Sequence, residues 1–270
     1  MVRRQPRTVR YPSMKLAANN IFSIELSTNE LYWLASAFGY TRLALPLNNL
    51  DDDLVNSLID GNNRLQSRNL IRPKDGVGWE VETLLVTLIR WLGDTNEFVS
   101  FDFQSRQNDS RSTYLLTSGS LGLYVEVVTE IFIFYFHPDR ISITNQVVNS
   151  LGFSSVNKKS NSSSFIIRQP TDLIRLAWEN IDTAIKVHDK SGNTTRDVQN
   201  TFQWLDSIQW TAVLSQKSTG IQDKPEKTVY IFGDGRAVWL SNVIIGEQDE
   251  IQMQSLLSQQ SIETQICKLL

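Results

Sequence analysis

One stretch of the chain occurs twice, and this repeat constrains the fold more than any other feature of the sequence. Residues 114–136 read as two strands joined by a glycine turn and followed by a third strand. Residues 230–240, YIFGDGRAVWL, repeat the opening of that stretch, with Tyr114 and Gly119 recurring as Tyr230 and Gly235 at one common offset. A supersecondary unit that is used twice predicts a pseudo-symmetric molecule.

Strand and helix patterns are both spread along the whole chain. Alternation and short apolar runs predict strands at 21–26, 98–103, 113–136, 165–168, 208–214, 229–232, 237–245 and 250–254. Helical spacing predicts helices at 29–38, 54–69, 80–92, 141–151, 173–187, 197–205 and 260–269. We therefore expect an α+β (mixed α/β) fold, a quasi-two-fold duplicated unit whose antiparallel-rich central sheet is flanked by helices. Residues 121–136 are apolar enough to be expected at its centre.

Composition shifts predict how the chain divides. Residues 1–20 hold five basic residues and no acid, with no apolar segment of a secretory signal, so we expect a disordered basic tail. Residues 154–164 are rich in Ser and Asn, as in a linker, and alternatively form a surface loop. The prediction is an N-terminal half at 21–153, this linker, and a C-terminal half at 165–270, together in one continuous globular domain.

The bulk properties narrow the functional classes. The 270 residues carry a net charge of −3, which gives no electrostatic footprint for nucleic acid or an anionic membrane. Apolar runs are too short to span a bilayer. The single Cys267 allows neither an intramolecular disulfide nor a cysteine-based zinc site. These properties predict a cytoplasmic protein.

No familiar catalytic pattern is present. His137 and His188 each stand near an aspartate at an element end and read as capping or turn residues. No cluster has metal-ligand spacing, and residues 51–53, three aspartates, fit the first turn of a helix. The prediction is a protein without catalysis, metal or cofactor, and an enzyme of unrecognised type is kept as an alternative.

A second alternative is a winged-helix regulator built from residues 54–79. A helix, a short strand, a glycine turn and another strand follow one another there. Arg64 and Arg68 are the cations that the recognition helix would offer to phosphates, against several acids. Nucleic-acid binding is therefore a minor expectation.

The order of elements, together with three short motifs, resembles the EspG family of type VII secretion chaperones. Residues 27–31 match a Ser-x-x-Glu-Leu helix start, and residues 65–70 match a Leu-x-x-Arg-Gly-Leu element in which Asn69 replaces the glycine. His137-Pro138 fits the strand, proline and helix that end each half. The second half departs from this pattern, because Leu256-Leu257-Ser258 has no proline. The resemblance covers about residues 22–270.

This resemblance implies a cytosolic, non-catalytic chaperone with a quasi-two-fold fold. Its partner would be the helical tip of an export substrate pair, PE/PPE-like or an analogue, which it keeps soluble. In that family the partner surface involves the loop between the second and third strands and the C-terminal helical part. The matching residues here are Gln104, Ser105, Arg106, Gln107, Asn108, Asp109, Arg111, Leu256, Leu257, Ile262 and Ile266.

Overall fold

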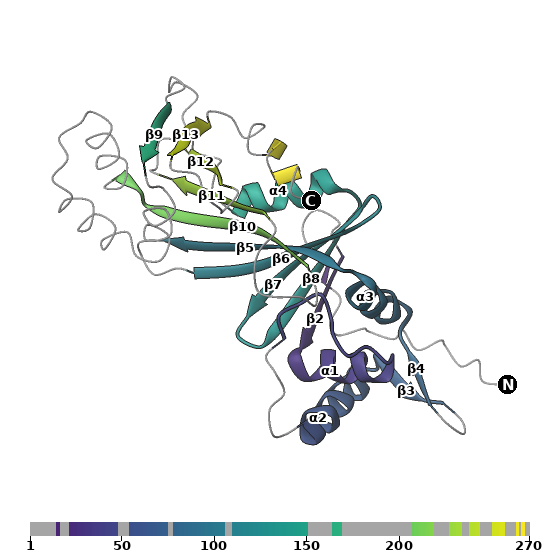
Figure 1. Ribbon diagram of the computed structural model, residues 1–270. Coiled ribbons are helices and arrows are strands. Elements are labelled where there is room, and N and C mark those ends of the chain that lie inside the picture. Colours follow the sequence, from purple (N-terminus) through teal and green to yellow (C-terminus); the bar gives the residue numbers. More distant parts are fainter. Residues whose placement is uncertain are drawn as a thin grey trace. The chain divides into compact units, whose positions relative to one another are not determined.

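The computed structural model divides the chain into two compact units (Figure 1). Unit 1 comprises Met1–Thr95 and Val127–Phe136, and unit 2 comprises Asn96–Glu126 and His137–Leu270. The residues that the structure describes are 15–16, 22–47, 54–74, 78–105, 110–150, 164–168, 207–218, 227–233, 238–243, 250–256, 263–264 and 266–267.

In its described residues, unit 1 combines three helices with two small sets of strands. Its elements are β1 (Lys15–Leu16), β2 (Phe22–Ser27), α1 (Thr28–Ala37), α2 (Leu54–Ser67), β3 (Ile71–Pro73), β4 (Trp79–Val81), α3 (Thr83–Asp94) and most of β8 (Ile131–His137). Strand β2 pairs antiparallel with β1 on one side and with β8 on the other, while β3 and β4 form a separate hairpin. The core gathers Leu31 and Leu34 of α1, Leu65 of α2 and Leu85 of α3, all fully buried.

Local signals explain where α1 and α2 begin and end. The Ser27 hydroxyl accepts a hydrogen bond from the Glu30 amide, and the Glu30 carboxylate accepts one from the Ser27 amide at 2.7 Å, which completes a capping box. Asn69 follows α2 in the left-handed conformation, with φ of 57°. Asparagine tolerates this conformation better than most residues, so it serves where the motif has glycine.

Unit 2 is built on an antiparallel sheet. Its strands are β5 (Glu97–Ser105), β6 (Ser110–Ser118), β7 (Leu121–Val128), β9 (Ser164–Arg168), β10 (Trp210–Ser218), β11 (Lys227–Gly233), β12 (Val238–Val243) and β13 (Glu250–Leu256). Their order is β7-β6-β5-β10-β11-β12-β13-β9. Helix α4 (Arg140–Ser150) packs on this sheet, since a Cβ at Gly122 would lie 3.3 Å from Ile143.

The α+β class and the antiparallel sheet are thus confirmed. Within unit 2 the order is symmetric about the β5–β10 pair, with β6 and β7 on one side and β11 and β12 on the other. The duplication itself stays a prediction, as do the halves at 21–153 and 165–270 and the linker between them. Most of the tail, most of residues 154–164, and the helices expected at 173–187 and 197–205 lie outside the described residues, while Lys15 and Leu16 of the tail pair with β2 as β1.

Three details of the sequence-based predictions were wrong. The helix expected from Glu80 begins at Thr83, because Trp79–Val81 pairs with β3 as β4. The stretch 121–136 is not buried throughout, since Leu121 and Val128 at the ends of β7 are exposed. Residues 121–136 were also expected at the centre of the sheet, whereas within unit 2 the middle of the strand order is held by β5 and β10.

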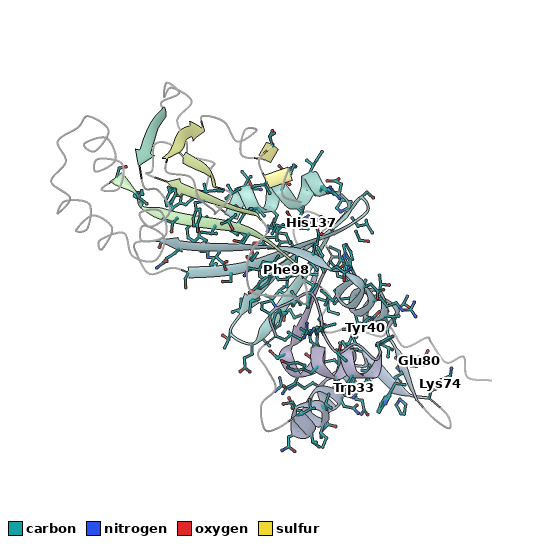
Figure 2. All side chains as sticks on the ribbon, viewed as in Figure 1. Trp33, Tyr40, Lys74, Glu80, Phe98 and His137 are labelled. Carbon is teal, nitrogen blue, oxygen red and sulfur yellow. The ribbon has the colours of Figure 1, made fainter. Side chains whose placement is uncertain are left out.

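His137 is not the capping or turn residue that we predicted. His137, labelled in Figure 2, is the last residue of β8 and only 3% exposed. Its ring meets that of Tyr124 edge to face, with centroids 6.4 Å apart. Among the described residues neither ring nitrogen has a hydrogen-bond partner. Asp139 instead caps α4, with its carboxylate 2.7 Å from the Ser142 amide.

Burial of His137 predicts a loss of stability on mild acidification. Burial lowers the pKa of His137 below its ordinary value near 6.5, and Asp139 only partly opposes this shift. The unfolded chain therefore takes up the proton more readily, so stability is fully present above pH 6.5 and falls as pH decreases from there towards the lowered pKa. We expect the melting temperature to fall between pH 7.5 and 6, before most carboxylates titrate.

The variant His137→Phe tests this prediction. Phenylalanine keeps an aromatic contact with Tyr124 but binds no proton, so the decrease between pH 7.5 and 6 should become smaller. Thermal melts of the wild type and the variant at several pH values measure the difference. Identical pH profiles would show that His137 does not carry the effect.

Candidate functional site

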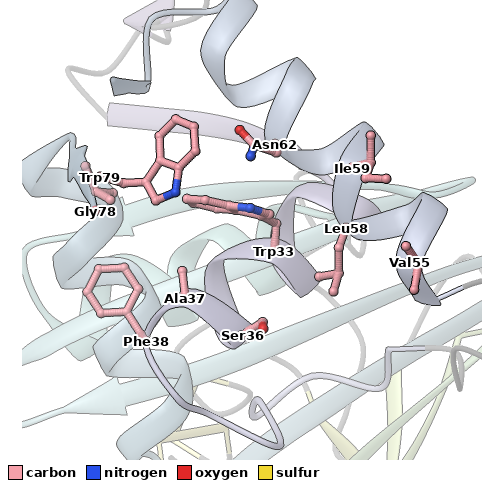
Figure 3. A pocket seen from close by; sticks show the side chains of 11 residues that line it. Trp33, Ser36, Ala37, Phe38, Val55, Leu58, Ile59, Asn62, Gly78 and Trp79 are labelled. Atoms are coloured by element: carbon pink, nitrogen blue, oxygen red, sulfur yellow. The ribbon is translucent and has the colours of Figure 1, made fainter. Parts of the chain in front are cut away.

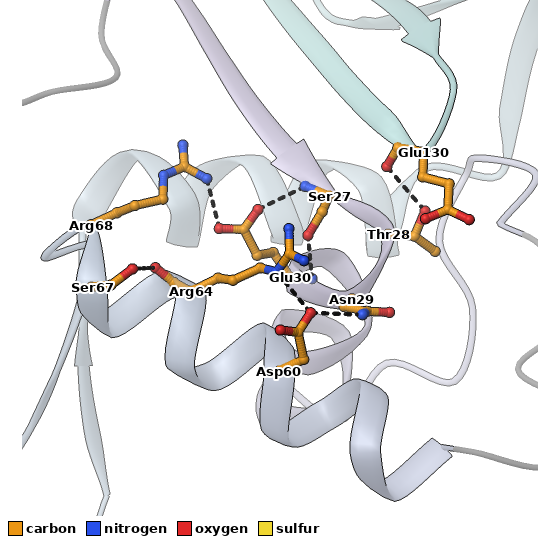
Figure 4. A network of polar contacts seen from close by, with 9 residues as sticks. All are labelled: Ser27, Thr28, Asn29, Glu30, Asp60, Arg64, Ser67, Arg68 and Glu130. Carbon is orange, nitrogen blue, oxygen red and sulfur yellow. Dashed lines mark hydrogen bonds and ion pairs between the residues drawn. The ribbon is translucent and has the colours of Figure 1, made fainter.

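A network of polar contacts holds α1 against α2 in unit 1 (Figure 4). Arg68, just after α2, donates to the buried Glu30 carboxylate at 2.6 Å and to the Glu25 carbonyl oxygen of β2 at 2.7 Å. From the same first turn of α1, the side-chain amide of Asn29 donates to Asp60 of α2 at 2.9 Å. Hydrogen bonds from Asn29 and then Arg64 hold the pKa of Asp60 below its usual range. Two polar contacts therefore tie the first turn of α1 to α2 and to the residue that follows it.

An open groove lies between α1, α2 and β4 (Figure 3). Its volume is about 580 Å³, and its apolar walls include Trp33, Phe38, Val55, Leu58, Ile59 and Trp79. The Trp33 and Trp79 rings meet edge to face, with centroids 5.5 Å apart and planes at 88°. Ser36 and Asn62 are the polar side chains of the wall, and no charged residue lines it among those the structure describes. Such a surface suits an apolar partner rather than a charged ligand.

This groove was not predicted from the sequence. The apolar residues of α2 recur at 54, 55, 58, 59 and 65, which is a wider stripe than one neighbouring helix covers. The width of this stripe was the feature of the sequence that could have indicated an apolar groove beside α2. The sequence cannot show which part of the stripe the chain's own elements cover.

The predicted binding loop is shorter than expected. Gln104 and Ser105 end β5, while Ser110 begins β6, and Gln104 pairs with Ser110. Arg111 lies within β6 opposite Phe103. Arg106, Gln107, Asn108 and Asp109 lie outside the described residues. The structure therefore puts the predicted residues that it describes at one end of a regular hairpin, and their role stays a prediction.

The C-terminal candidates do not form one surface among the described residues. Leu256 ends strand β13 opposite Val238, so it belongs to the sheet rather than to a helix. Ile266 is only 1% exposed and contributes to the core. Nearby, Cys267 lies 3.3 Å from the Thr144 hydroxyl of α4. Leu257 and Ile262 lie outside the described residues.

The arginines of the winged-helix alternative are already engaged in contacts. Arg64 forms an ion pair with Asp60 at 2.7 Å, and Arg68 forms one with Glu30. The exposed residues Val55 and Ile59 give the outer side of α2 an apolar character. A winged-helix protein that binds DNA presents cations on its recognition helix, so this arrangement gives the winged-helix alternative no support.

The described residues also bear on metal binding and on the membrane. They hold no group of three or more His, Cys, Asp or Glu side chains that could bind a metal ion. None of the helices in these ranges is long and apolar enough to cross a membrane.

The fold is that of the EspG chaperones of type VII secretion, as the sequence resemblance predicted. One of the matching solved structures is the Mycobacterium tuberculosis type VII secretion system chaperone EspG5, in complex with a PE25–PPE41 dimer. The match has a TM-score of 0.58 and covers 92% of this chain and 95% of that chain, at 10% sequence identity. No family model and no curated protein matches the sequence. At this identity the similarity establishes the fold.

Proposed function

We propose that this chain is a non-catalytic cytoplasmic chaperone or adaptor that binds a helical export substrate pair and keeps it soluble for secretion. The carrying observation is the fold similarity to EspG5 over 92% of the chain, because that protein was solved with a PE25–PPE41 dimer bound. The client of this chain is a PE/PPE-like pair or an analogue.

The β5–β6 hairpin end is the proposed contact surface in unit 2. It comprises Gln104, Ser105 and Arg111, which the structure describes, and the intervening residues 106–109. Strands β5 and β6 pair over six consecutive residue pairs up to Gln104 and Ser110. The ladder fixes the positions at which a loop leaves and re-enters the sheet, and binding residues often lie on loops that a rigid scaffold holds in this way. The C-terminal candidates Leu256, Leu257 and Ile262 are included as a less direct part of the proposal.

Shortening this hairpin tests the proposal. We expect that replacing residues 105–109 with Asn-Gly leaves a two-residue turn that the flanking strands accept, so the melting temperature changes little. Retention of the client by the tagged protein from native cytosol should fall at least tenfold. Mass spectrometry of the retained proteins measures this.

A matched control shortens the polar residues 219–226 between β10 and β11, which should leave client retention unchanged. Equal retention by the wild type and the variant shortened at 105–109 would contradict the proposed hairpin site. Retention of nucleic acid without a protein would instead favour the winged-helix alternative.

A further inference from the structure

Unit 1 exposes a group of large apolar side chains on and beside the groove. The exposed fractions are 48% for Leu54, 69% for Val55, 53% for Ile59 and 37% for Trp79. Three of these residues line the groove, and Leu54 precedes Val55 at the start of α2. Contiguous exposed apolar surface rimmed by polar residues marks interaction sites on soluble proteins.

The area of this group is too small for association of two globular copies. Even at roughly 200 Å² for each fully exposed side chain, a value typical of aromatic residues and larger than aliphatic ones offer, the four exposed fractions amount to at most about 400 Å². A standard interface buries about 800 Å² on each partner. An area of this size instead matches one face of a single helix, which inserts a few side chains into a groove of about 580 Å³.

The groove wall also restricts the chemistry of its occupant. Among the described residues that line it none is charged, and the nearby Asp60 and Arg64 of α2 are paired with each other. An occupant must therefore present uncharged side chains at the contact. Phosphate groups and strongly charged peptides have no partner there.

The spacing of the wall residues suits a helix. Val55, Ile59 and Asn62 stand at i, i+4 and i+7 of α2, a ridge against which the ridge of a second helix packs. Trp33, 8% exposed, forms a floor beneath the edge of Trp79, which is the kind of aromatic pocket that anchors a side chain (Figure 3).

We propose that this groove docks one amphipathic helix of the client, through an uncharged apolar stripe, as a contact additional to the β5–β6 hairpin. That the docked helix belongs to an export client rests on the proposed function.

A designed peptide probe tests the groove without the natural client. The probe is a fluorescein-labelled 18-residue helix with leucines at i, i+4, i+7 and i+11 and Lys and Glu on the opposite face. Fluorescence anisotropy with the full chain should show saturable binding. Ile59→Asp, an exposed position that tolerates a charge, should raise the dissociation constant at least tenfold because the carboxylate loses water in the complex.

The matched control is Ile141→Asp, an equally simple change at a residue of α4 in unit 2 that is 67% exposed. This variant should bind the probe as the wild type does, and a scrambled peptide of the same composition should not bind. Equal loss in both variants, or equal binding of the scrambled peptide, would overturn the proposal. Concentration-dependent dimers of the wild type that Ile59→Asp abolishes would assign the groove to a second copy.

The client pull-down separates failure of this inference from failure of the proposed function. If a client is retained through the hairpin but Ile59→Asp captures as much as the wild type, the groove proposal is overturned and the chaperone function stands. If no client is retained by any variant while the helical probe still binds at Ile59, the proposed function is contradicted instead.

Discussion

Arg68→Met is expected to lower the free energy of unfolding by about 3–5 kcal/mol, the usual loss when one partner of a buried ion pair is removed. The Glu30 side chain is 3% exposed, and Arg68 reaches it from the end of α2 at 2.6 Å. Without the guanidinium, the carboxylate keeps its hydrogen bond from the Ser27 amide but loses its counter-charge. The Glu25 carbonyl oxygen loses a donor as well.

A double-mutant cycle tests whether the loss comes from the Glu30 carboxylate that is left buried without its counter-charge. Glu30→Gln retains a capping-box side chain without charge, so adding it to Arg68→Met should restore part of the stability. Urea unfolding of the wild type, both single variants and the double variant measures the coupling. Strictly additive losses would mean that the pair contributes nothing beyond its separate members.

Arg64→Met, four residues earlier and within α2, is the matched control. The Arg64–Asp60 pair is exposed, with 54% and 41% of the two side chains accessible, and pairs of this kind contribute about 1 kcal/mol or less. A loss for Arg64→Met as large as that for Arg68→Met would show that burial of the Arg68–Glu30 pair does not cause the effect.

The start of α1 and the end of α2 could be predicted because their signals are local. Ser27 and Glu30 stand at capping-box spacing, and Asn69 takes the left-handed turn where the related motif has glycine. The role of Arg68 could not be predicted in the same way. Its partners are 38 and 43 residues away in the sequence. From the sequence alone, the same arginine was also a candidate for a phosphate contact in the winged-helix alternative.

The groove and the division into units depend on long-range packing. The stripe of α2 predicts an amphipathic helix but not that α1 covers only one side of it, leaving Val55 and Ile59 exposed. Similarly, the sequence predicts β7 and β8 as two successive strands but does not show their partners. Strand β8 pairs with β2 from the first part of the chain, while β7 pairs with β6. Periodicity along the chain contains no information about such partners.

Gly61→Ala is expected to destabilise the protein, although intrinsic helix propensity predicts the opposite. In an ordinary helix interior alanine is favoured over glycine by about 1 kcal/mol. Gly61, however, is buried where α2 crosses α1. A Cβ there would fall on the Asn29 carbonyl oxygen and lie 2.6 Å from the Asn29 carbonyl carbon. These are backbone atoms, so the helices themselves would have to move apart.

The clash should outweigh the propensity gain. Overpacking typically costs about 1–3 kcal/mol, and here separation of the helices also strains the hydrogen bond between Asn29 and Asp60. We expect a net loss of about 2 kcal/mol in urea unfolding. Asn63→Ala, on the exposed side of the same helix, isolates the propensity term and should raise stability by a few tenths of a kcal/mol. A stabilised Gly61→Ala variant would mean that α1 and α2 separate at little energetic cost. The groove between them would then be adaptable in width, and the expected tenfold effect of Ile59→Asp on probe binding should shrink accordingly.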